Sequence, residues 1–158
     1  MNPADYEPWL AELGVEPAER AAGGVRIRSA LAATLADTRG RWLLGGAHPL
    51  AHSELRLSGV YEGRIVNVSI DRYLVDGAGV RWVIDYKTSS HEGGDLDGFL
   101  AREEMRYRAQ LRRYASLVGA MNEAVATIGA GAAGPVRAAL YFPLLGVFRE
   151  VDLSALER

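Results

Sequence analysis

The sequence contains no cysteine among its 158 residues. This absence excludes disulfide bonds, thiolate metal sites and cysteine nucleophiles. The chain also lacks any run of about 18 apolar residues, so we expect no membrane-spanning segment. Its acidic start, MNPADYEPWLAEL, has no apolar stretch of the kind found in signal peptides. We therefore expect a cytoplasmic protein with no membrane partner.

The charge and composition are those of an ordinary soluble domain. The formal net charge is only −2, which predicts no strong overall attraction to nucleic acid but leaves room for a local basic patch. Apolar residues make up 49% of the chain and charged residues 24%, as in a typical globular protein. This length suits a single core, so we expect residues 1–158 to form one domain.

Of two phosphate-binding motifs, one is absent from the sequence and the other occurs without the strand and helix that it requires. No G-x-x-x-x-G-K-[ST] motif occurs, so the chain has no ATPase motor of its own. Residues 129–134, GAGAAG, match the dinucleotide pattern G-x-G-x-x-G. That pattern requires a strand before it and a helix after it, whereas here a predicted helix precedes it and Pro135 follows. We therefore interpret this segment as a loop of small residues.

The hydrophobic periodicity changes along the chain and predicts its elements. Residues 1–25 contain three prolines and the pair Gly23-Gly24, so we expect them to be irregular apart from a short helix around Trp9–Leu13. A helix is predicted over 26–38 and is expected to end at Gly40. The later elements expected are three strands near 55–57, 65–70 and 80–84, a long helix over about 97–119, and a hairpin of strands 136–143 and 147–153.

A helix between two groups of strands usually covers one face of a mixed sheet. The predicted order therefore indicates the α/β or α+β class, with a central mixed sheet of about five strands flanked by helices. The irregular segment 1–25 would precede a core spanning 26–153.

Two aspartates each follow an apolar run. Asp71 closes IVNVSID, and Asp85 closes RWVID. If a hairpin at 76–79, which contains an Asp-Gly pair, joins these strands, the two carboxylates can lie side by side. Lys87 is two residues after Asp85 and shares its face of the strand.

Converging carboxylates repel each other, so one is protonated unless a cation lies between them. Oxygen ligands completed by water suit Mg²⁺ or Mn²⁺. A lysine beside such an ion can help to deprotonate an attacking water or neutralise a phosphate oxygen, which is chemistry suited to phosphodiester hydrolysis. The alternative is a surface hairpin in which Asp71 pairs with Arg72 or Lys87 as a solvated ion pair worth ~0–1 kcal/mol.

The long predicted helix carries the most basic segment of the chain. Gln110 and Tyr114 are four residues apart and share one face of this helix. The arginines of this basic segment are Arg106, Arg108, Arg112 and Arg113. One interpretation is that these arginines and Gln110 bind DNA phosphates beside the acidic site. The other is a solvated amphipathic helix that packs its tyrosines and leucines on the sheet, and different faces can serve both purposes.

The three histidines are weaker candidates. His48 and His52 flank Pro49 without a second cluster of ligands, so we expect ordinary loop positions. His91 follows the Asp-x-Lys strand and could approach a bound phosphate, although we do not expect it to be catalytic.

Three motifs occur in an order that resembles a known family. They are Gly63 followed by Ile-Asp-Arg at 70–72, Ile-Asp-Tyr-Lys-Thr at 84–88, and Q-x-x-x-Y at Gln110 and Tyr114. Over about residues 26–150 the chain resembles the RecB-like branch of the PD-(D/E)xK nuclease superfamily. It looks most like the C-terminal nuclease domain of AddA-type, UvrD/Rep-family DNA helicases. The resemblance implies a restriction-endonuclease-like core.

The resemblance also implies roles for individual residues. Asp71 and Asp85 would be metal ligands together with the backbone carbonyl of Tyr86, and Lys87 would be the catalytic lysine. The implied cofactor is Mg²⁺ or Mn²⁺. Gln110 and Tyr114 would brace the site and contact DNA, with Arg106 and Arg113 as further DNA-binding residues. Glu54 matches an acid often found before the first strand of such domains, and we assign it no role.

The chain departs from the family pattern in its first part. Family members usually carry an upstream G-x-x-x-H helix whose histidine helps to bind the metal, and residues 1–50 contain no such match. Such domains are also normally fused to a helicase motor. The simplest interpretation is an excised C-terminal domain that binds metal weakly and cleaves poorly. The implied partners are DNA, the helicase motor domains of a parent chain and a partner subunit.

Three functions follow from these observations. The leading one is a metal-dependent DNA exonuclease domain acting in double-strand break repair. The second is a nuclease-like module that binds DNA or partner subunits without cutting. The third is a hydrolase with two catalytic carboxylates, such as a glycosidase, but a lysine two residues after the acid suits a metal site better.

Overall fold

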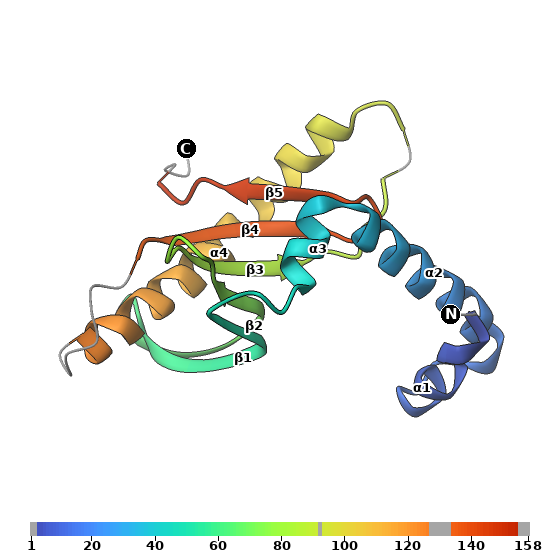
Figure 1. Ribbon diagram of the computed structural model, residues 1–158, viewed down its shortest axis with the longest axis horizontal. Helices are drawn as coiled ribbons and strands as arrows, with labels where there is room; N and C mark the ends of the chain where they lie inside the picture. The colour runs from blue at the N-terminus through green and yellow to red at the C-terminus, as the bar shows by residue number, and fades with distance from the viewer. Residues whose placement is uncertain (1–2, 92, 127–133, 155–158) are drawn as a thin grey trace. The chain divides into compact units, whose positions relative to one another are not determined.

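The computed structural model describes residues 3–91, 93–126 and 134–154. Most of the glycine-rich segment 129–134 therefore lies outside the described residues, and its interpretation as a loop stays a prediction. The elements, drawn in Figure 1, are a 3-10 helix (Pro3–Tyr6), α1 (Glu7–Glu12), α2 (Pro17–Ala36), α3 (Thr38–Leu44), β1 (Leu50–Tyr61), β2 (Arg64–Val75), β3 (Arg81–Tyr86), α4 (Leu96–Ala126), β4 (Val136–Phe142) and β5 (Val147–Val151).

The five strands form one mixed sheet in the order β1-β2-β3-β4-β5. Strands β1, β2 and β3 are antiparallel neighbours, whereas β3 and β4 are parallel. The parallel pair requires a crossover, and α4 supplies it between them. The predicted five-stranded mixed sheet and long helix are thus confirmed, and α4 runs beyond the predicted end to Ala126.

Helix α4 packs against strands β1 and β3 and builds the core from one long apolar face. Leu111 and Val118 of this helix are fully buried, as are Val83 and Ile84 of β3. The approach is closest at Gly59 of β1, where an added Cβ would lie 2.7 Å from a methyl carbon of Leu117. The five residues Arg81–Asp85 are all buried, and β3 is the middle strand of the five-stranded sheet.

Helix α1 corresponds to the short helix expected around Trp9–Leu13, but the prediction that the rest of 1–25 is irregular is wrong, because most of the first half of α2 lies within it. Pro17 occupies the first turn of α2, where a missing backbone N–H costs nothing. Gly23 lies inside the helix, and an added Cβ would lie 3.1 Å from a methyl carbon of Leu10 in α1. The glycine that looked like a helix breaker therefore permits close packing of α1 on α2.

Gly40 does not end a helix either. Helix α2 ends at Ala36, and Gly40 is a buried residue within α3. Asp37 separates the two helices in an extended conformation, and its Oδ2 accepts a hydrogen bond of 2.7 Å from the Gly40 backbone N–H. Asp37 is therefore the N-cap of α3, which starts the second helix at once.

The two hairpin turns of the antiparallel strands have recognisable chemistry. Glu62 and Gly63 both have positive φ, of 49° and 74°, which is the two-residue turn that matches the twist of paired strands. In the β2–β3 turn, Asp76 Oδ1 accepts hydrogen bonds from the N–H groups of Ala78 and Val80 at 2.9 and 3.0 Å. These contacts set the register of β2 against β3.

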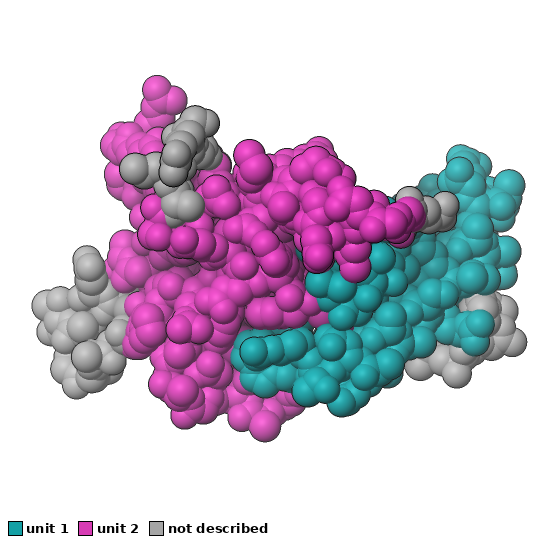
Figure 2. Space-filling model, turned by 90° about the horizontal axis from the view of Figure 1, so that it is seen from above, with its two compact units in different colours: residues 1–44, 88–90, 142–147 teal, residues 45–87, 91–141, 148–158 magenta. Residues whose placement is uncertain are grey.

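The described chain divides into two compact units, coloured teal and magenta in Figure 2. Unit 1 contains α1, α2 and α3 with the short segments 88–90 and 142–147, and unit 2 contains residues 45–87, 91–141 and the segment from Phe148 onward. Most of the sheet, and all of α4, lie in unit 2. The expectation of a single domain stays a prediction. None of the helices in the described part of the chain is both long and apolar enough to cross a membrane.

Arg81 ties the start of β3 to α4. Its side chain is buried and donates hydrogen bonds of 2.7 Å to the Gly134 carbonyl and 3.0 Å to the Val118 carbonyl.

We expect Arg81→Met to lower the free energy of unfolding by about 2–3 kcal/mol, because two carbonyls lose a charged donor. Urea denaturation measures this change. The exposed Arg28→Met is the control and should stay within about 0.5 kcal/mol of the original protein. Equal effects of the two changes would contradict the proposed tie.

Candidate active site

The register of β2 against β3 brings the two predicted aspartates together. Arg72 pairs with Ile84, so the next step of this antiparallel ladder sets Asp71 opposite Asp85, with both side chains on one face. The Asp71 Oδ2 atom accepts a hydrogen bond of 2.8 Å from the Tyr86 backbone N–H. Asp71 does not close its strand as expected, because β2 continues to Val75.

Asp85 is the most buried acid of the site, with a side chain only 5% exposed. Its Oδ1 accepts a hydrogen bond of 2.9 Å from Gln110 Nε2. Its Oδ2 forms an ion pair with the Lys87 ammonium but accepts no hydrogen bond, although it is buried. The carboxylate is thus oriented from one side by α4 and neutralised from the other by its own strand.

Lys87 has a second contact besides Asp85. Its Nζ lies 3.5 Å from the centroid of the Tyr107 ring, well within the range of a cation–π interaction. Lys87 is also the only lysine in the sequence, beside 17 arginines.

Gln110 connects Asp85 to Tyr114. Besides its bond to Asp85, Gln110 Nε2 donates a hydrogen bond of 2.8 Å to the Tyr114 hydroxyl. Burial raises the pKa of Tyr114 above its usual value, so the phenol stays protonated at neutral pH. The predicted pairing of Gln110 with Tyr114 across one helical turn is therefore present and extends to the site.

Burial raises the pKa of Asp71 above its usual value, against the lowering effect of the hydrogen bond from Tyr86. The negative charges of Asp85 and Glu54 raise it further. A cation placed among such carboxylates favours their charged forms and so lowers the raised pKa.

Glu54 is the residue that the sequence marked without a role. The pairs Ser53–Arg72 and Leu55–Ile70 set it opposite Asp71, on the other side from Asp85. Its φ of 52° is left-handed, a conformation that costs a residue with a side chain of the order of 1–3 kcal/mol and is concentrated at functional sites. Its Oε2 accepts a hydrogen bond of 3.2 Å from Ser69 Oγ. Nothing in the sequence spacing indicates this backbone conformation.

The residues present fit a divalent cation with oxygen ligands. Asp71 and Asp85 supply carboxylates on one face, and the buried Asp85 Oδ2 has no hydrogen bond. The described residues contain no group of three or more His, Cys, Asp or Glu side chains arranged to hold a metal. Such a donor set suits Mg²⁺ or Mn²⁺, which retain several waters, rather than a cation that needs a full set of protein ligands.

The histidines do not complete this donor set within the described residues. His52 lies on β1 and stacks on Tyr73 at a centroid distance of 6.4 Å. His91 stacks on Phe99 at 4.9 Å, and its buried Nε2 has no hydrogen-bond partner. The structure therefore assigns His91 an aromatic contact with the start of α4.

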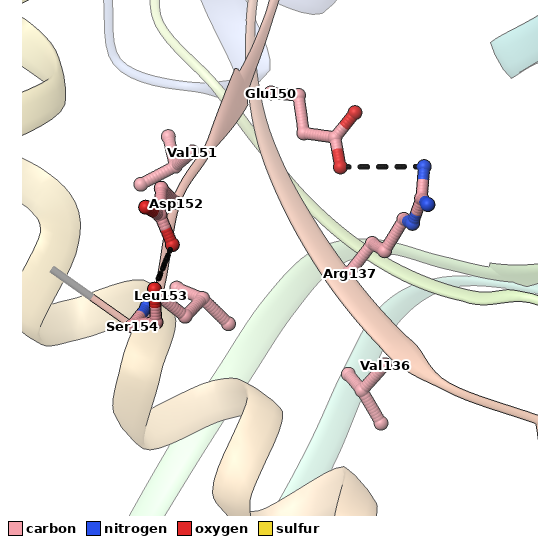
Figure 3. A pocket seen from close by; sticks show the side chains of 7 residues that line it. All are labelled: Val136, Arg137, Glu150, Val151, Asp152, Leu153 and Ser154. Carbon is pink, nitrogen blue, oxygen red and sulfur yellow. Dashed lines mark hydrogen bonds and ion pairs between the residues drawn. The ribbon is translucent and has the colours of Figure 1, made fainter.

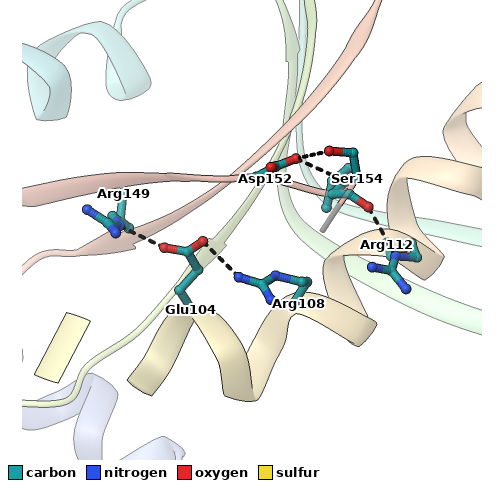
Figure 4. A network of polar contacts seen from close by, with 7 residues as sticks. Glu104, Arg108, Arg112, Arg149, Asp152 and Ser154 are labelled. Carbon is teal, nitrogen blue, oxygen red and sulfur yellow. Dashed lines mark hydrogen bonds and ion pairs between the residues drawn. The ribbon is translucent and has the colours of Figure 1, made fainter. Parts of the chain in front are cut away.

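The four arginines in the basic segment 106–113 of α4 divide into two pairs. Arg108 and Arg112 are held by the protein: Arg108 pairs with Glu104 at 3.1 Å, and Arg112 donates to the Leu153 carbonyl at 3.2 Å. Figure 4 shows this network along α4 and β5. Arg106 and Arg113 are exposed. Their guanidinium carbons lie 5.3 and 5.7 Å from the ring centroids of Tyr107 and Tyr61.

A hollow of about 530 Å³ lies away from these residues. Figure 3 shows its lining at the ends of β4 and β5, where Arg137 and Glu150 form an ion pair of 3.5 Å. It includes none of the predicted site residues. The candidate site, in which Gln110 of α4 contacts the buried Asp85, therefore lies outside this hollow.

A family model described as the PD-(D/E)XK nuclease superfamily matches residues 7–155. This match confirms the superfamily part of the sequence resemblance and, with the five-stranded mixed sheet, the predicted fold class. No curated protein matches the chain at a significant level. The more specific likeness to RecB-like and AddA-type domains stays a prediction.

The raised pKa of Asp71 predicts a cost in stability. The folded state holds this proton to a higher pH than the unfolded state, so stability is lost as the pH rises through that interval. Asp71→Asn removes the charge and retains an oxygen for the Tyr86 N–H. We expect it to raise the melting temperature at pH 7 without divalent ions, and the gain to shrink toward pH of about 4, near the usual carboxyl pKa. The exposed Asp97→Asn is the control and should show no such gain. A lower melting temperature for Asp71→Asn at pH 7 would contradict the assignment.

Proposed function

Because the chain belongs to the PD-(D/E)XK nuclease superfamily, we propose that it is a Mg²⁺- or Mn²⁺-dependent DNA exonuclease domain. We further propose that it works within a RecB/AddA-like helicase-nuclease in DNA double-strand break repair. The observation that carries the proposal is the arrangement of Asp85, which lies opposite Asp71 and is held by Gln110 and Lys87.

The carboxylates of Asp71 and Asp85 would hold the divalent cation, with the Tyr86 backbone carbonyl as a further ligand. A bound cation of this kind supplies a nucleophilic water at neutral pH and offsets the charge that develops on the phosphate. The Tyr86 N–H and Gln110 fix one oxygen of each aspartate, and the second oxygen of Asp85 is paired with Lys87.

Lys87 would act on the reacting groups directly. Its ammonium lies beside Asp85, where it can orient the attacking water or neutralise a phosphate oxygen. Gln110 and Tyr114 hold the Asp85 carboxylate in position from α4. These proposed roles of Lys87, Gln110 and Tyr114 are the ones that the sequence motifs imply.

Arg106 and Arg113 are the proposed DNA contacts. Both are exposed on the helix that carries Gln110, and exposed arginines supply the charge that neutralises phosphates. The net charge of the chain is −2, so DNA binding would depend on this local segment and weaken steeply with salt. The proposed partners are therefore DNA, helicase motor domains and a partner subunit.

A catalytically weak or inactive binding module is the second candidate. The observation that favours it is the small donor set, because the described residues contain no group of three potential metal ligands. Such a module would bind DNA in a salt-dependent manner without cleaving it.

The nuclease proposal predicts that the protein degrades linear DNA with Mg²⁺ or Mn²⁺ and not in excess chelator. We expect Asp85→Ala and Lys87→Ala each to lower the rate by at least about 10²–10³-fold, since each removes a charged group at the reacting phosphate. Release of acid-soluble nucleotides from end-labelled duplexes measures the rate. Asp97→Asn serves as the control and should retain the original rate. Undiminished cleavage by both site variants would exclude the assignment, whereas DNA binding without cleavage by the original protein would favour the binding module.

The same site predicts a metal-dependent gain in stability. A ligand that binds only the folded state raises the melting temperature as its concentration exceeds the dissociation constant. We expect Mg²⁺ and Mn²⁺ to raise the melting temperature of the original protein and to have little effect on Asp71→Asn or Asp85→Asn. Differential scanning fluorimetry across a metal titration, without DNA, provides this measurement. Equal shifts in all three proteins would place the ion elsewhere.

A further inference from the structure

We infer that Tyr107 is a positioning residue for Lys87, a role that rests on the nuclease function proposed above. The ring of Tyr107 faces the Lys87 ammonium at 3.5 Å from its centroid. This contact extends the Q-x-x-x-Y motif of α4 by one turn toward its start. The motif that serves the site is therefore Tyr107, Gln110 and Tyr114, spaced as Y-x-x-Q-x-x-x-Y.

The helical period explains why these three residues act together. Positions three and seven residues after Tyr107 return to the same face of an α-helix. Gln110 contacts Asp85 and Tyr114 contacts Gln110, while Tyr107 contacts Lys87. One face of α4 thus contacts both functional residues at the end of β3.

Lysine at this position needs such support. Its ammonium is a compact charge on a flexible four-carbon stem, and that stem has considerable rotamer freedom. Here the ammonium is held from two directions, by the Asp85 carboxylate and by the face of the ring, and the Lys87 side chain is only 15% exposed. Arginine, which fills every other permanently charged basic position of the sequence, has a broad planar head that is not interchangeable with the compact lysine ammonium.

The two contacts of the Lys87 ammonium, with Asp85 and with Tyr107, respond differently when Asp85 binds another cation. The ion pair with Asp85 weakens whenever that carboxylate is engaged by another cation. The Tyr107 ring has no net charge, and it attracts the Lys87 ammonium through the ring quadrupole. Tyr107 therefore keeps the ammonium directed toward the reacting groups when Asp85 is engaged elsewhere.

Arg106 offers a competing explanation for the ring. Its guanidinium carbon lies 5.3 Å from the same centroid, and it pairs with Glu103 at 3.7 Å. The Arg106 side chain is 70% exposed, however, and its contact with the ring is the longer one. If Tyr107 served Arg106 instead, Arg106→Ala would reproduce the effects of removing the ring.

The single lysine makes the contact directly measurable. Protein labelled with ¹³C-lysine gives one lysine spin system, and protons above a ring face are shifted upfield by the ring current. We expect an upfield Lys87 Hε signal in the metal-free protein and in Tyr107→Phe. We expect the signal to return toward ordinary lysine values in Tyr107→Leu and to stay unchanged in Arg106→Ala. The shift in the original protein requires no variant, so it tests the contact even if Tyr107→Leu folds poorly.

Kinetics on linear DNA then test the positioning role. We expect Tyr107→Leu to lower kcat by about 10-fold or more with little change in KM, because the loss falls on the transition state rather than on binding. Tyr107→Phe should retain the original kcat within about 3-fold, since the ring and not the hydroxyl acts on Lys87. Arg106→Ala should change KM rather than kcat.

Three outcomes would overturn the inference. They are an ordinary Lys87 signal in the original protein, an unchanged kcat in Tyr107→Leu, and a loss of activity in Tyr107→Phe equal to that in Tyr107→Leu. Failure of the nuclease proposal looks different. The original protein would then cleave no DNA. An upfield Lys87 signal that Tyr107→Leu abolishes would still show that the Tyr107 ring contacts this lysine.

Discussion

The antiparallel register between β2 and β3 is the constraint on which the candidate site depends. This register sets Asp71 opposite Asp85 and leaves Lys87 on the same face two residues later. A slip of one residue would turn either aspartate to the opposite face of the sheet. The Asp76 side chain fixes the turn between the strands through two backbone N–H groups. A feature far from the reacting groups therefore determines whether two carboxylates can share one cation.

Helix α4 converts this alignment into an oriented site. Its apolar face, including Leu111 and Val118, is buried in the core, so the helix cannot rotate without losing that packing. A neighbouring face then presents Gln110 to Asp85 and Tyr107 to Lys87. The same packing that stabilises the fold thus holds the functional side chains. This arrangement has a cost in folding stability, because burial and the neighbouring acids disfavour the charged form of Asp71 and raise its pKa.

The strands and the long helix could be predicted because their apolar residues recur with clear periods of two and about four. The proximity of Asp71 and Asp85 followed from the same pattern, since a short turn leaves few ways to pair the strands. The first part of α2 was missed because Pro17 and Gly23 are usually helix breakers. Here Pro17 occupies the first turn, and Gly23 admits Leu10. The contact of Tyr107 with Lys87 could not be predicted, since it depends on how α4 is rotated over the sheet.

The central claim is that Asp71 and Asp85 together hold a divalent cation beside Lys87. A crystal of the protein soaked in Mn²⁺, with data collected to locate manganese by its anomalous scattering, tests this claim most directly. The account predicts an anomalous peak within coordination distance of both carboxylates, about 2.0–2.3 Å from their oxygens. A fully occupied manganese bound elsewhere, with Asp85 still paired to Lys87, would contradict it.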